Sequence, residues 1–456
     1  MRATILLIAI LMGCGGTSSG PSTDGFQVVA GANLVDTALA KPAQALTIRV
    51  NGGDSGVAVT FEPVPSPLGG QHTTVSGLGS TAFQERLDVV TDRRGQAGAR
   101  LWFGSKAGDG WIRITIPSAN AIDSVRFTIT PAALFALSAD PSDTTILLGG
   151  TSTPRIGIAD SYGNARPGDP YVLRPKDDVT TATGGVIRGA KVGRSTVEVS
   201  AGNQRGDIYV AVAPAVDLAG VTNAGLATVR ADGANFRLIV PVPLPGLVSP
   251  TRMSWLPDAS AAVFDAVSVL YIARKNGTWL RLTDGSEAAQ APIVSGDGQW
   301  IYYARQTQGT WRIHRIRLDG TGDELVLGDA VPLTWPAPSP DGKYLAYIAA
   351  NHELRILDLV SRVSTALHAP AATPAWSPDG VDLGFICADG PCLIRPDGSQ
   401  LREVGARGGY TNGLSWSPDG RWLMTNNFVV QLVERSTGVA VPLTTRLGVS
   451  AVTWAR

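Results

Sequence analysis

Trp376-Ser377-Pro378-Asp379-Gly380 recurs 40 residues later as Trp416-Ser417-Pro418-Asp419-Gly420, and this motif decides the fold of the C-terminal half of the 456-residue chain. The first positions of its copies are 255, 294, 338, 376 and 416, followed by 454, so the steps are 39, 44, 38, 40 and 38 residues. A repeat of about 40 residues is typical of a four-stranded unit. The weaker copies are Pro338-Ser339-Pro340-Asp341-Gly342, Val294-Ser295-Gly296-Asp297-Gly298 and Trp255-Leu256-Pro257-Asp258.

Each copy reads as a tight turn that leads into a strand. In Ser-Pro-Asp-Gly, Pro presets φ, Asp accepts backbone hydrogen bonds and Gly adopts a positive φ. Alternating segments such as Gln299–Ala304 and Lys343–Ile348 follow, and short outer strands such as Trp279–Thr283 end the units. Radial stacking would bury the apolar surface of each unit, which predicts a β-propeller. We therefore interpret Asp258, Asp297, Asp341, Asp379 and Asp419 as turn residues, and Trp255, Trp376, Trp416 and Trp454 as core.

The two ends of this region complement each other. Gly225–Ile239 reads as the outer half of a blade, and Val452-Thr453-Trp454 reads as an inner strand without its outer half. Joined, they would form a sixth blade and close the ring. The sequence therefore predicts a six-bladed propeller over residues 215–456.

The repeats resemble the TolB-type propeller, which is built from W-S-P-D-G motifs and D-G-x-x-x-x-L-T outer strands. TolB itself is a soluble periplasmic protein with an α/β domain before its propeller, whereas this chain has a lipoprotein-like leader and β-rich modules there. The resemblance implies the fold, and the specific Tol-complex role does not transfer with it.

Two β-rich modules precede the propeller. In residues 26–131, the turn Thr91–Ala97 and the strand Trp111–Ile116 resemble the bacterial Ig-like repeat of invasin-type surface proteins. In residues 132–214, Asp160–Asn164, Gly185–Gly189 and Gly193–Val199 resemble a second bacterial Ig-like family. We therefore predict an all-β protein with two Ig-like β-sandwiches before the propeller. Such modules serve as spacers or as ligand-binding units, and we favour spacers.

The N-terminus reads as a lipoprotein signal. Residues 1–13 hold a short positive start and an apolar run too short to span a bilayer. Leu11-Met12-Gly13-Cys14 resembles a bacterial lipobox, which implies lipidation of Cys14, and residues 14–25 form a polar tether. Gly15 after the Cys favours the outer over the inner membrane, in a periplasmic or surface-exposed position. The alternative is an ordinary secretory signal with a chance Cys.

The other two cysteines, Cys387 and Cys392, flank the turn Ala388-Asp389-Gly390-Pro391 between two apolar segments. A hairpin of that length would place them across from each other, within disulfide reach, in an exported protein. Two free thiols are the alternative, and a metal pair is disfavoured by the spacing.

Composition and motifs limit the functional classes. The chain has 38 basic and 38 acidic residues, which disfavours nucleic-acid binding through a basic surface. No nucleophile elbow, zinc-protease or phosphate-loop motif occurs, so we predict no enzyme, cofactor or metal. We predict an envelope protein or peptide as partner of the propeller, and a glycan bound by an adhesive surface lipoprotein is the alternative. The candidate binding residues at the channel mouth are Arg252, Gln290, Trp335, Thr373, Tyr410 and Asn412.

Overall fold

The computed structural model describes residues 25–65, 67–222, 224–241, 252–328, 335–388, 390–405, 413–426, 429–443, 447 and 450–455. These residues form β-strands and one short 3-10 helix, η1 (Pro117–Ala119), which confirms the all-β class. No helix in this part of the chain is long and apolar enough to cross a membrane. The predicted signal, Cys14 and most of the tether lie outside the described residues.

The chain divides into two compact units. One contains the residues up to Ser138, together with Ile156–Tyr171 and Ser200–Arg205. The other contains Ala139–Arg155, Val172–Val199 and Gly206–Arg456. The strands of the second β-rich module are therefore shared between the two units.

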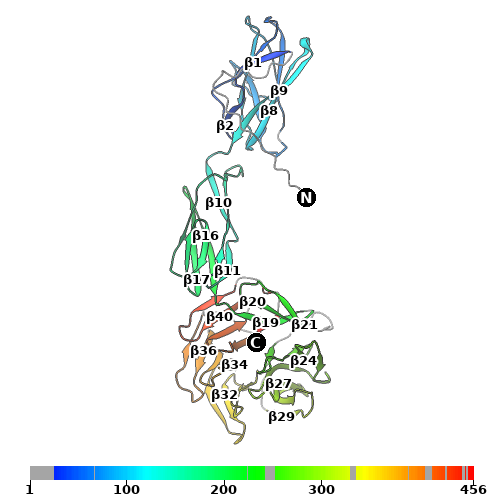
Figure 1. The fold of residues 1–456 in the computed structure, drawn as a ribbon, viewed down its shortest axis with the longest axis vertical. Helices are drawn as coiled ribbons and strands as arrows, with labels where there is room; N and C mark the ends of the chain where they lie inside the picture. The colour runs from blue at the N-terminus through cyan, green and yellow to red at the C-terminus, as the bar shows by residue number, and fades with distance from the viewer. Residues whose placement is uncertain are drawn as a thin grey trace, which may run out of the picture. The chain divides into compact units, whose positions relative to one another are not determined.

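The first β-rich module consists of two sheets around one core (Figure 1). Its alternating strands bury Ile48, Phe61, Phe103 and Ile114 completely, and this pairing of inner faces is the packing of a β-sandwich. The first sheet has the order β1 (Phe26–Ala30), β3 (Leu46–Val50), β7 (Gln96–Trp102) and β5 (Thr74–Gly77). The second has the order β2 (Leu34–Thr37), β9 (Ala121–Thr130), β8 (Gly108–Ile116), β4 (Ala58–Pro63) and β6 (Leu87–Val90).

The second β-rich module contains three small sheets. Its buried positions alternate along β17, where Val197 and Val199 face inward, as expected for a sheet with one apolar face. The sheets have the orders β10 (Leu134–Asp140) and β13 (Arg155–Asp160); β11 (Asp143–Leu147), β18 (Gln204–Ala213), β17 (Gly193–Ala201) and β14 (Val172–Pro175); and β12 (Thr151–Ser152), β16 (Val186–Gly189) and β15 (Thr180–Thr183).

Within the described residues, the C-terminal region forms six four-stranded sheets, as predicted for six blades. Blade 1 contains β21 (Arg237–Pro241), β20 (Gly225–Arg230), β19 (Asp217–Thr222) and β42 (Ser450–Trp454). Blade 2 contains β22 (Met253–Trp255), β23 (Ala261–Ala266), β24 (Val269–Arg274) and β25 (Trp279–Arg281), and blade 3 contains β26 (Ala289–Val294), β27 (Trp300–Thr307), β28 (Thr310–Arg317) and β29 (Glu324–Leu327). Blade 4 contains β30 (Ala337–Pro338), β31 (Tyr344–Ile348), β32 (Leu354–Asp358) and β33 (Ser364–His368). Blade 5 contains β34 (Ala372–Trp376), β35 (Leu383–Cys387), β36 (Gly390–Ile394) and β37 (Arg402–Glu403), and blade 6 contains β38 (Gly413–Trp416), β39 (Trp422–Asn426), β40 (Val430–Glu434) and β41 (Ala440–Pro442).

Blade 1 closes the ring with strands from both ends of the propeller. The C-terminal β42 pairs antiparallel with β19, with Trp454 opposite Leu218 and Thr453 opposite Ala219. β42 is the innermost strand of this sheet. The predicted completion of the first blade by the last strand is therefore confirmed.

The repeated turn is held by its serine and aspartate. In four blades, Ser295, Ser339, Ser377 and Ser417 each donate to the aspartate two residues later at 2.5–2.6 Å. Each serine hydroxyl also accepts a backbone N–H from five residues later, at 2.9–3.0 Å. These carboxylates serve the turns as interpreted from the sequence.

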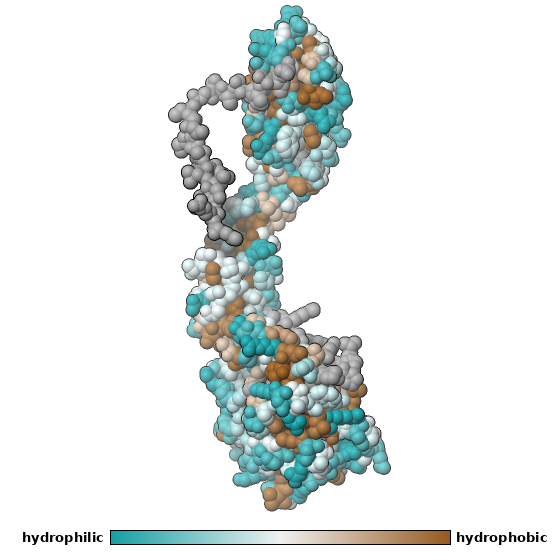
Figure 2. Space-filling view, turned by 45° about the vertical axis from the view of Figure 1, so that its right-hand side comes forward, coloured by the Kyte–Doolittle hydropathy of each residue, from teal (hydrophilic) through white to brown (hydrophobic). Residues whose placement is uncertain are grey.

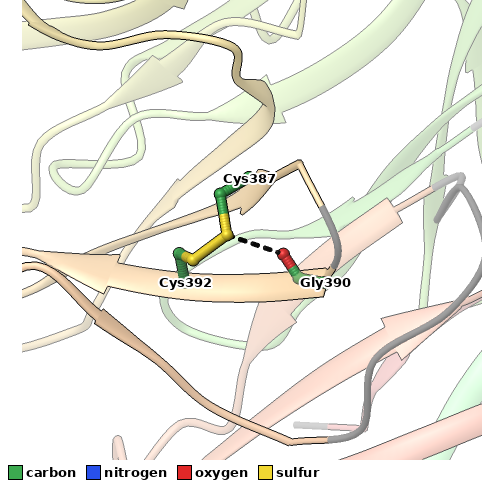
Figure 3. Close-up of a disulfide and its surroundings, with 3 residues drawn as sticks. All are labelled: Cys387, Gly390 and Cys392. Carbon is green, nitrogen blue, oxygen red and sulfur yellow. Dashed lines mark hydrogen bonds between the residues drawn. A yellow bond between two sulfur atoms is a disulfide. The ribbon is translucent and has the colours of Figure 1, made fainter.

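Cys387 and Cys392 form a disulfide in the hairpin between β35 and β36 (Figure 3). The expected register of this hairpin is wrong. Gly390 and Pro391 already belong to β36, so Cys387 pairs with Gly390, and Cys392 pairs with Phe385. The two cysteines are therefore diagonal neighbours with a Cα–Cα distance of 5.8 Å, because the turn is shorter than the four residues expected.

The second β-rich module packs on the propeller within one unit. β18 ends at Ala213, and β19 begins at Asp217. Ala213 shares a buried cluster with Trp422 and Leu432 of blade 6, and Leu147 packs against that cluster. A continuous apolar core thus joins this end of the module to the propeller.

Candidate functional site

The inner strands of the blades surround a central cavity of about 700 Å³, which we call the channel. Every blade contributes to its wall because each inner strand carries the repeated motif or its remnant. Arg252 is the only charged side chain among the described residues that line it. The other lining residues used below are Ser254, Trp255, Trp376, Ser415, Trp416, Thr453 and Trp454.

The recurring tryptophans are both core and channel wall. Trp255, Trp416 and Trp454 are buried, and Trp376 is half-buried. Three of the indoles also join neighbouring blades, because their Nε1 atoms donate to backbone oxygens of the preceding inner strand. These bonds are Trp376 to Ala337 at 2.9 Å, Trp416 to Ala375 at 3.0 Å and Trp454 to Ser415 at 3.2 Å.

Blade 2 departs from this pattern. The buried Nε1 of Trp255 has no hydrogen-bond partner among the described residues. The ammonium of Lys275 lies 5.2 Å from the centroid of its ring. Blades 2 and 3 are linked by a different hydrogen bond, in which the backbone N–H of Val294 donates to the side-chain hydroxyl of Ser254 at 3.1 Å.

Two of the residues proposed from the sequence meet in the structure. The guanidinium carbon of Arg252, in blade 2, lies 5.1 Å from the centroid of the Trp335 ring, which directly precedes blade 4. Both side chains are 8% exposed. The backbone N–H of Arg252 donates to Oδ1 of the buried Asp265 at 3.0 Å, which fixes the start of β22 against β23.

The other proposed residues have different outcomes. Thr373 is buried in β34, and its hydroxyl has no hydrogen-bond partner among the described residues. The side-chain Nε2 of Gln290 donates to the Ser268 hydroxyl at 3.1 Å, so this amide is engaged at a neighbouring turn. Tyr410 and Asn412 lie outside the described residues.

Burial controls the electrostatics of Arg252. Burial lowers the pKa of its guanidinium to about 10, and the negative charge of Asp265 offsets only part of this effect. Arg252 therefore carries a positive charge at neutral pH. Its Nη1 atom has no hydrogen-bond partner among the described residues, although it is buried.

Sequence reasoning missed Ser415, which lines the channel from blade 6 with a buried hydroxyl that has no partner in the described part of the chain. The sequence position of Ser415 could have identified it, because this residue directly precedes the motif tryptophan Trp416. A residue at that position on an inner strand borders the channel in every blade, as Ser254 and Thr453 also do.

A second cavity of about 260 Å³ lies beside Tyr303, Arg305 and Asp323, next to the outer part of blade 2. Asp323 accepts hydrogen bonds from Tyr303 at 2.7 Å and from Arg305, and it pairs with His314 at 3.1 Å. Burial alone would raise the pKa of Asp323, but His314, Tyr303 and Arg305 together lower it. The Asp323 carboxylate is therefore paired with three side chains of its own blade.

Among the described residues, no group of three or more His, Cys, Asp or Glu could hold a metal ion.

Comparison with models of known protein families yields no match. One curated relative, the "Uncharacterized protein Atu1656" of Agrobacterium fabrum (strain C58 / ATCC 33970), is 30% identical over 105 residues. The similarity covers 22% of this chain and 36% of the relative, so the chain spans about a third of the length of that protein.

Several solved structures are similar to this chain at low sequence identity. TolB from Acinetobacter baumannii is 15% identical with a TM-score of 0.43, and the match covers 63% of this chain and 83% of that one. A putative TolB from Agrobacterium tumefaciens is 18% identical with a TM-score of 0.41 over 50% of this chain and 87% of that one. An oligogalacturonate lyase in complex with manganese is 17% identical with a TM-score of 0.34 over 43% of this chain and 65% of that one. The propeller fold of this chain is established by its six four-stranded sheets and by the pairing of β42 with β19, which closes the ring.

Proposed function

We propose that this chain is a non-enzymatic, lipid-anchored protein of the bacterial envelope that binds a protein or peptide partner in its propeller channel. The observation that carries the proposal is the 700 Å³ channel, whose size is that of a ligand site. Its wall combines tryptophan rings with a few buried polar atoms that have no partner among the described residues. Apolar walls with sparse polar groups are typical of binding sites.

The absence of paired catalytic groups supports a binding role. The described residues that line the channel include no Asp, Glu, His, Cys or Lys. General acid–base or nucleophilic catalysis needs such groups within hydrogen-bond reach of one another. We therefore favour recognition over turnover in the channel.

In this proposal, Cys14 carries the lipid and the polar tether leads to the β-rich modules, which act as spacers. Gly15 favours the outer membrane, with a periplasmic or surface-exposed chain. The apolar cluster shared by Ala213 and Trp422 supports the spacer role, because it attaches the second module firmly to the propeller.

The test is capture of partners from envelope extract after light crosslinking, with the full chain in detergent as bait. Ser415→Trp would place an indole in the channel and narrow it, and Val360→Trp adds the same ring at a side chain that is 87% exposed. We expect an envelope protein to be recovered with the wild type and V360W and lost with S415W, and the purified protein to bind in the same order.

Equal recovery with all three baits would place the partner elsewhere and overturn the channel as its site. Recovery of glycan instead of protein would favour the alternative, a carbohydrate-binding or adhesive surface lipoprotein. Turnover of a substrate that S415W abolishes would refute the non-enzymatic assignment.

A further inference from the structure

We propose that the part of the channel lined by Arg252 is a subsite for a carboxylate group of the peptide partner. This inference rests on the proposed function and adds the chemistry of the bound group. It would make an acidic residue, or a C-terminal carboxylate, the anchor of the segment that enters the channel.

Arg252 lines the channel. Its guanidinium contacts the ring of Trp335, which precedes the inner strand of blade 4. Thr373 lies in an irregular part of β34, where the pairing register with β35 shifts between Ala372 and Ala375.

Arg252 is held in place for recognition. Its backbone is fixed by the 3.0 Å hydrogen bond to Asp265, and its guanidinium stacks against the Trp335 ring at 5.1 Å. A guanidinium over an aromatic face keeps its N–H edge available for a planar acceptor. Because Trp335 precedes blade 4, this contact joins residues of two blades that are not neighbours in the ring.

The missing interactions point to an acceptor. Nη1 of Arg252 and the hydroxyl of Thr373 are buried without hydrogen-bond partners among the described residues, and both residues are 8% exposed. Such groups lose hydration without compensation, which is costly in a folded protein. A carboxylate offers two acceptor oxygens and a negative charge, so it would pair with the Arg252 guanidinium in its preferred geometry.

The charge balance favours a singly charged ligand. Arg252 remains a cation at neutral pH, since burial lowers its pKa only to about 10. Asp265 already supplies part of the opposing charge. Arg252 and Asp265 together are formally neutral, so a carboxylate adds one negative charge to this buried site and a doubly charged phosphate adds two, which is the costlier burial.

The surrounding wall favours a peptide as the carrier of that carboxylate. The innermost strands of the six sheets have one edge that no other strand of their sheet covers. Backbone groups at such edges can pair with an extended chain. Tryptophan rings and prolines on the wall supply apolar contact for its side chains.

The test compares two neutral-capped tripeptides, Ac-Gly-Asp-Gly-NH2 and Ac-Gly-Asn-Gly-NH2, by ligand-observed NMR with the full chain in detergent. We expect the Asp peptide to bind at least about tenfold more tightly, because charge-assisted hydrogen bonds are the stronger ones. Arg252→Gln should reduce this ratio to about one. Arg281→Gln removes an exposed cation of the same blade that does not line the channel, and it should leave the ratio unchanged.

Arg252→Lys keeps the positive charge but loses the planar set of donors, so it should reduce the ratio about threefold and provides a second test if R252Q does not fold. A wild-type ratio of one, or a ratio that neither R252Q nor R252K changes, would overturn the subsite. Discrimination of galacturonate from galactose through Arg252, without discrimination of the peptides, would overturn the peptide assignment.

The envelope capture separates this inference from the proposed function. Recovery that S415W abolishes and R252Q does not would refute the subsite while the channel remains the partner site. Peptide discrimination that depends on Arg252, with no envelope protein captured, would support the subsite and contradict the proposed partner.

Discussion

The indole Nε1 of Trp454 donates a hydrogen bond to the backbone oxygen of Ser415 at 3.2 Å, which ties the last strand of the chain to the blade before it. The same bond joins Trp416 to Ala375 and Trp376 to Ala337. In blades 1, 5 and 6, tryptophan thus packs in the blade and also joins it to the preceding blade. The ring is held by repeated side-chain bonds as well as by the pairing of β42 with β19.

Trp454→Phe should lower the free energy of unfolding by about 1 kcal/mol, because it removes the indole N–H and retains an aromatic ring. A change of that size corresponds to about 2–4 °C in the melting temperature of a domain of this length. Chemical denaturation followed by tryptophan fluorescence measures it. Trp255→Phe is the matched control and should cost less, because its Nε1 has no partner among the described residues. Equal losses in both variants would contradict the role of the bond.

Deletion of residues 450–456 should open the ring. β19 and the outer strands of blade 1 would lose their inner neighbour and leave an uncovered sheet edge. Limited proteolysis should then cut the segment 217–241 much faster than in the full chain. A synthetic peptide of residues 450–456 added in trans should restore part of the protection, and unchanged resistance of the truncated chain would refute closure by β42.

The Cys387–Cys392 disulfide should contribute modestly to stability, because it closes a loop with a sequence separation of only 5. The chain-entropy relation gives about 2 kcal/mol for a loop this short. The double variant C387A/C392A should therefore stay folded and unfold at a lower denaturant concentration. Reduction of the wild type should produce the same shift. Labelling of both cysteines by a thiol reagent without prior reduction would show two free thiols instead.

Asp379 should make the propeller sensitive to acid. Burial would raise the pKa of this carboxyl, but hydrogen bonds from Arg435, Ser377 and the Val381 backbone outweigh burial and lower it to about 2. A depressed pKa stabilises the folded state above the unfolded value near 4, and the stabilisation is lost as the pH falls from about 4 to about 2.

Since the Asp379 side chain is 48% exposed, its ion pair with Arg435 is worth at most about 1 kcal/mol. Asp379→Asn should therefore lower the free energy of unfolding by that amount at pH 6, and the difference from the wild type should shrink towards pH 3. Denaturation curves at several pH values measure this. Asp419→Asn, at the same turn position in blade 6, controls for the turn itself; identical pH profiles would exclude a contribution from Arg435.

Asn164 should lock the loop of the second β-rich module to the loop that contains Ser105 and Ala107. Its side chain is buried, donates to the Ser105 backbone oxygen at 2.8 Å and accepts the Ala107 N–H at 2.9 Å. Asn164→Ala should cost about 2–3 kcal/mol, because it leaves both backbone groups unpaired. Amide exchange of Ala107 should accelerate markedly, whereas Lys106→Gln, which removes only the hydrogen bond from Nζ to the Tyr162 backbone oxygen, should accelerate it much less.

The apolar residues exposed on the propeller are scattered among hydrophilic ones on the face visible in Figure 2. Scattered apolar residues are ordinary for a folded surface and carry no binding site by themselves. The candidate site is therefore the channel.

The sequence by itself determined the all-β class, the six blades and the closure by the final strand. These features follow from local patterns: the Ser-Pro-Asp-Gly turn forms within six residues, and its spacing counts the blades. Gly225–Ile239 and Val452–Trp454 are each an incomplete blade, so the sequence predicted that together they form one. The register of the cysteine hairpin was not determined, because a Gly-Pro pair can belong either to a turn or to the start of a strand.

Only the tertiary structure decided which residues face the channel and which polar atoms lack partners. Arg252 and Trp335 are 83 residues apart in the sequence, and their contact exists because the ring brings two non-adjacent blades within reach of each other. Burial of the Arg252 guanidinium, and hence its lowered pKa, depends on atoms from several blades at once. A repeat pattern determines the position of each strand. The burial and the polar partners of a side chain in the channel depend on residues from the whole ring, which no local pattern contains.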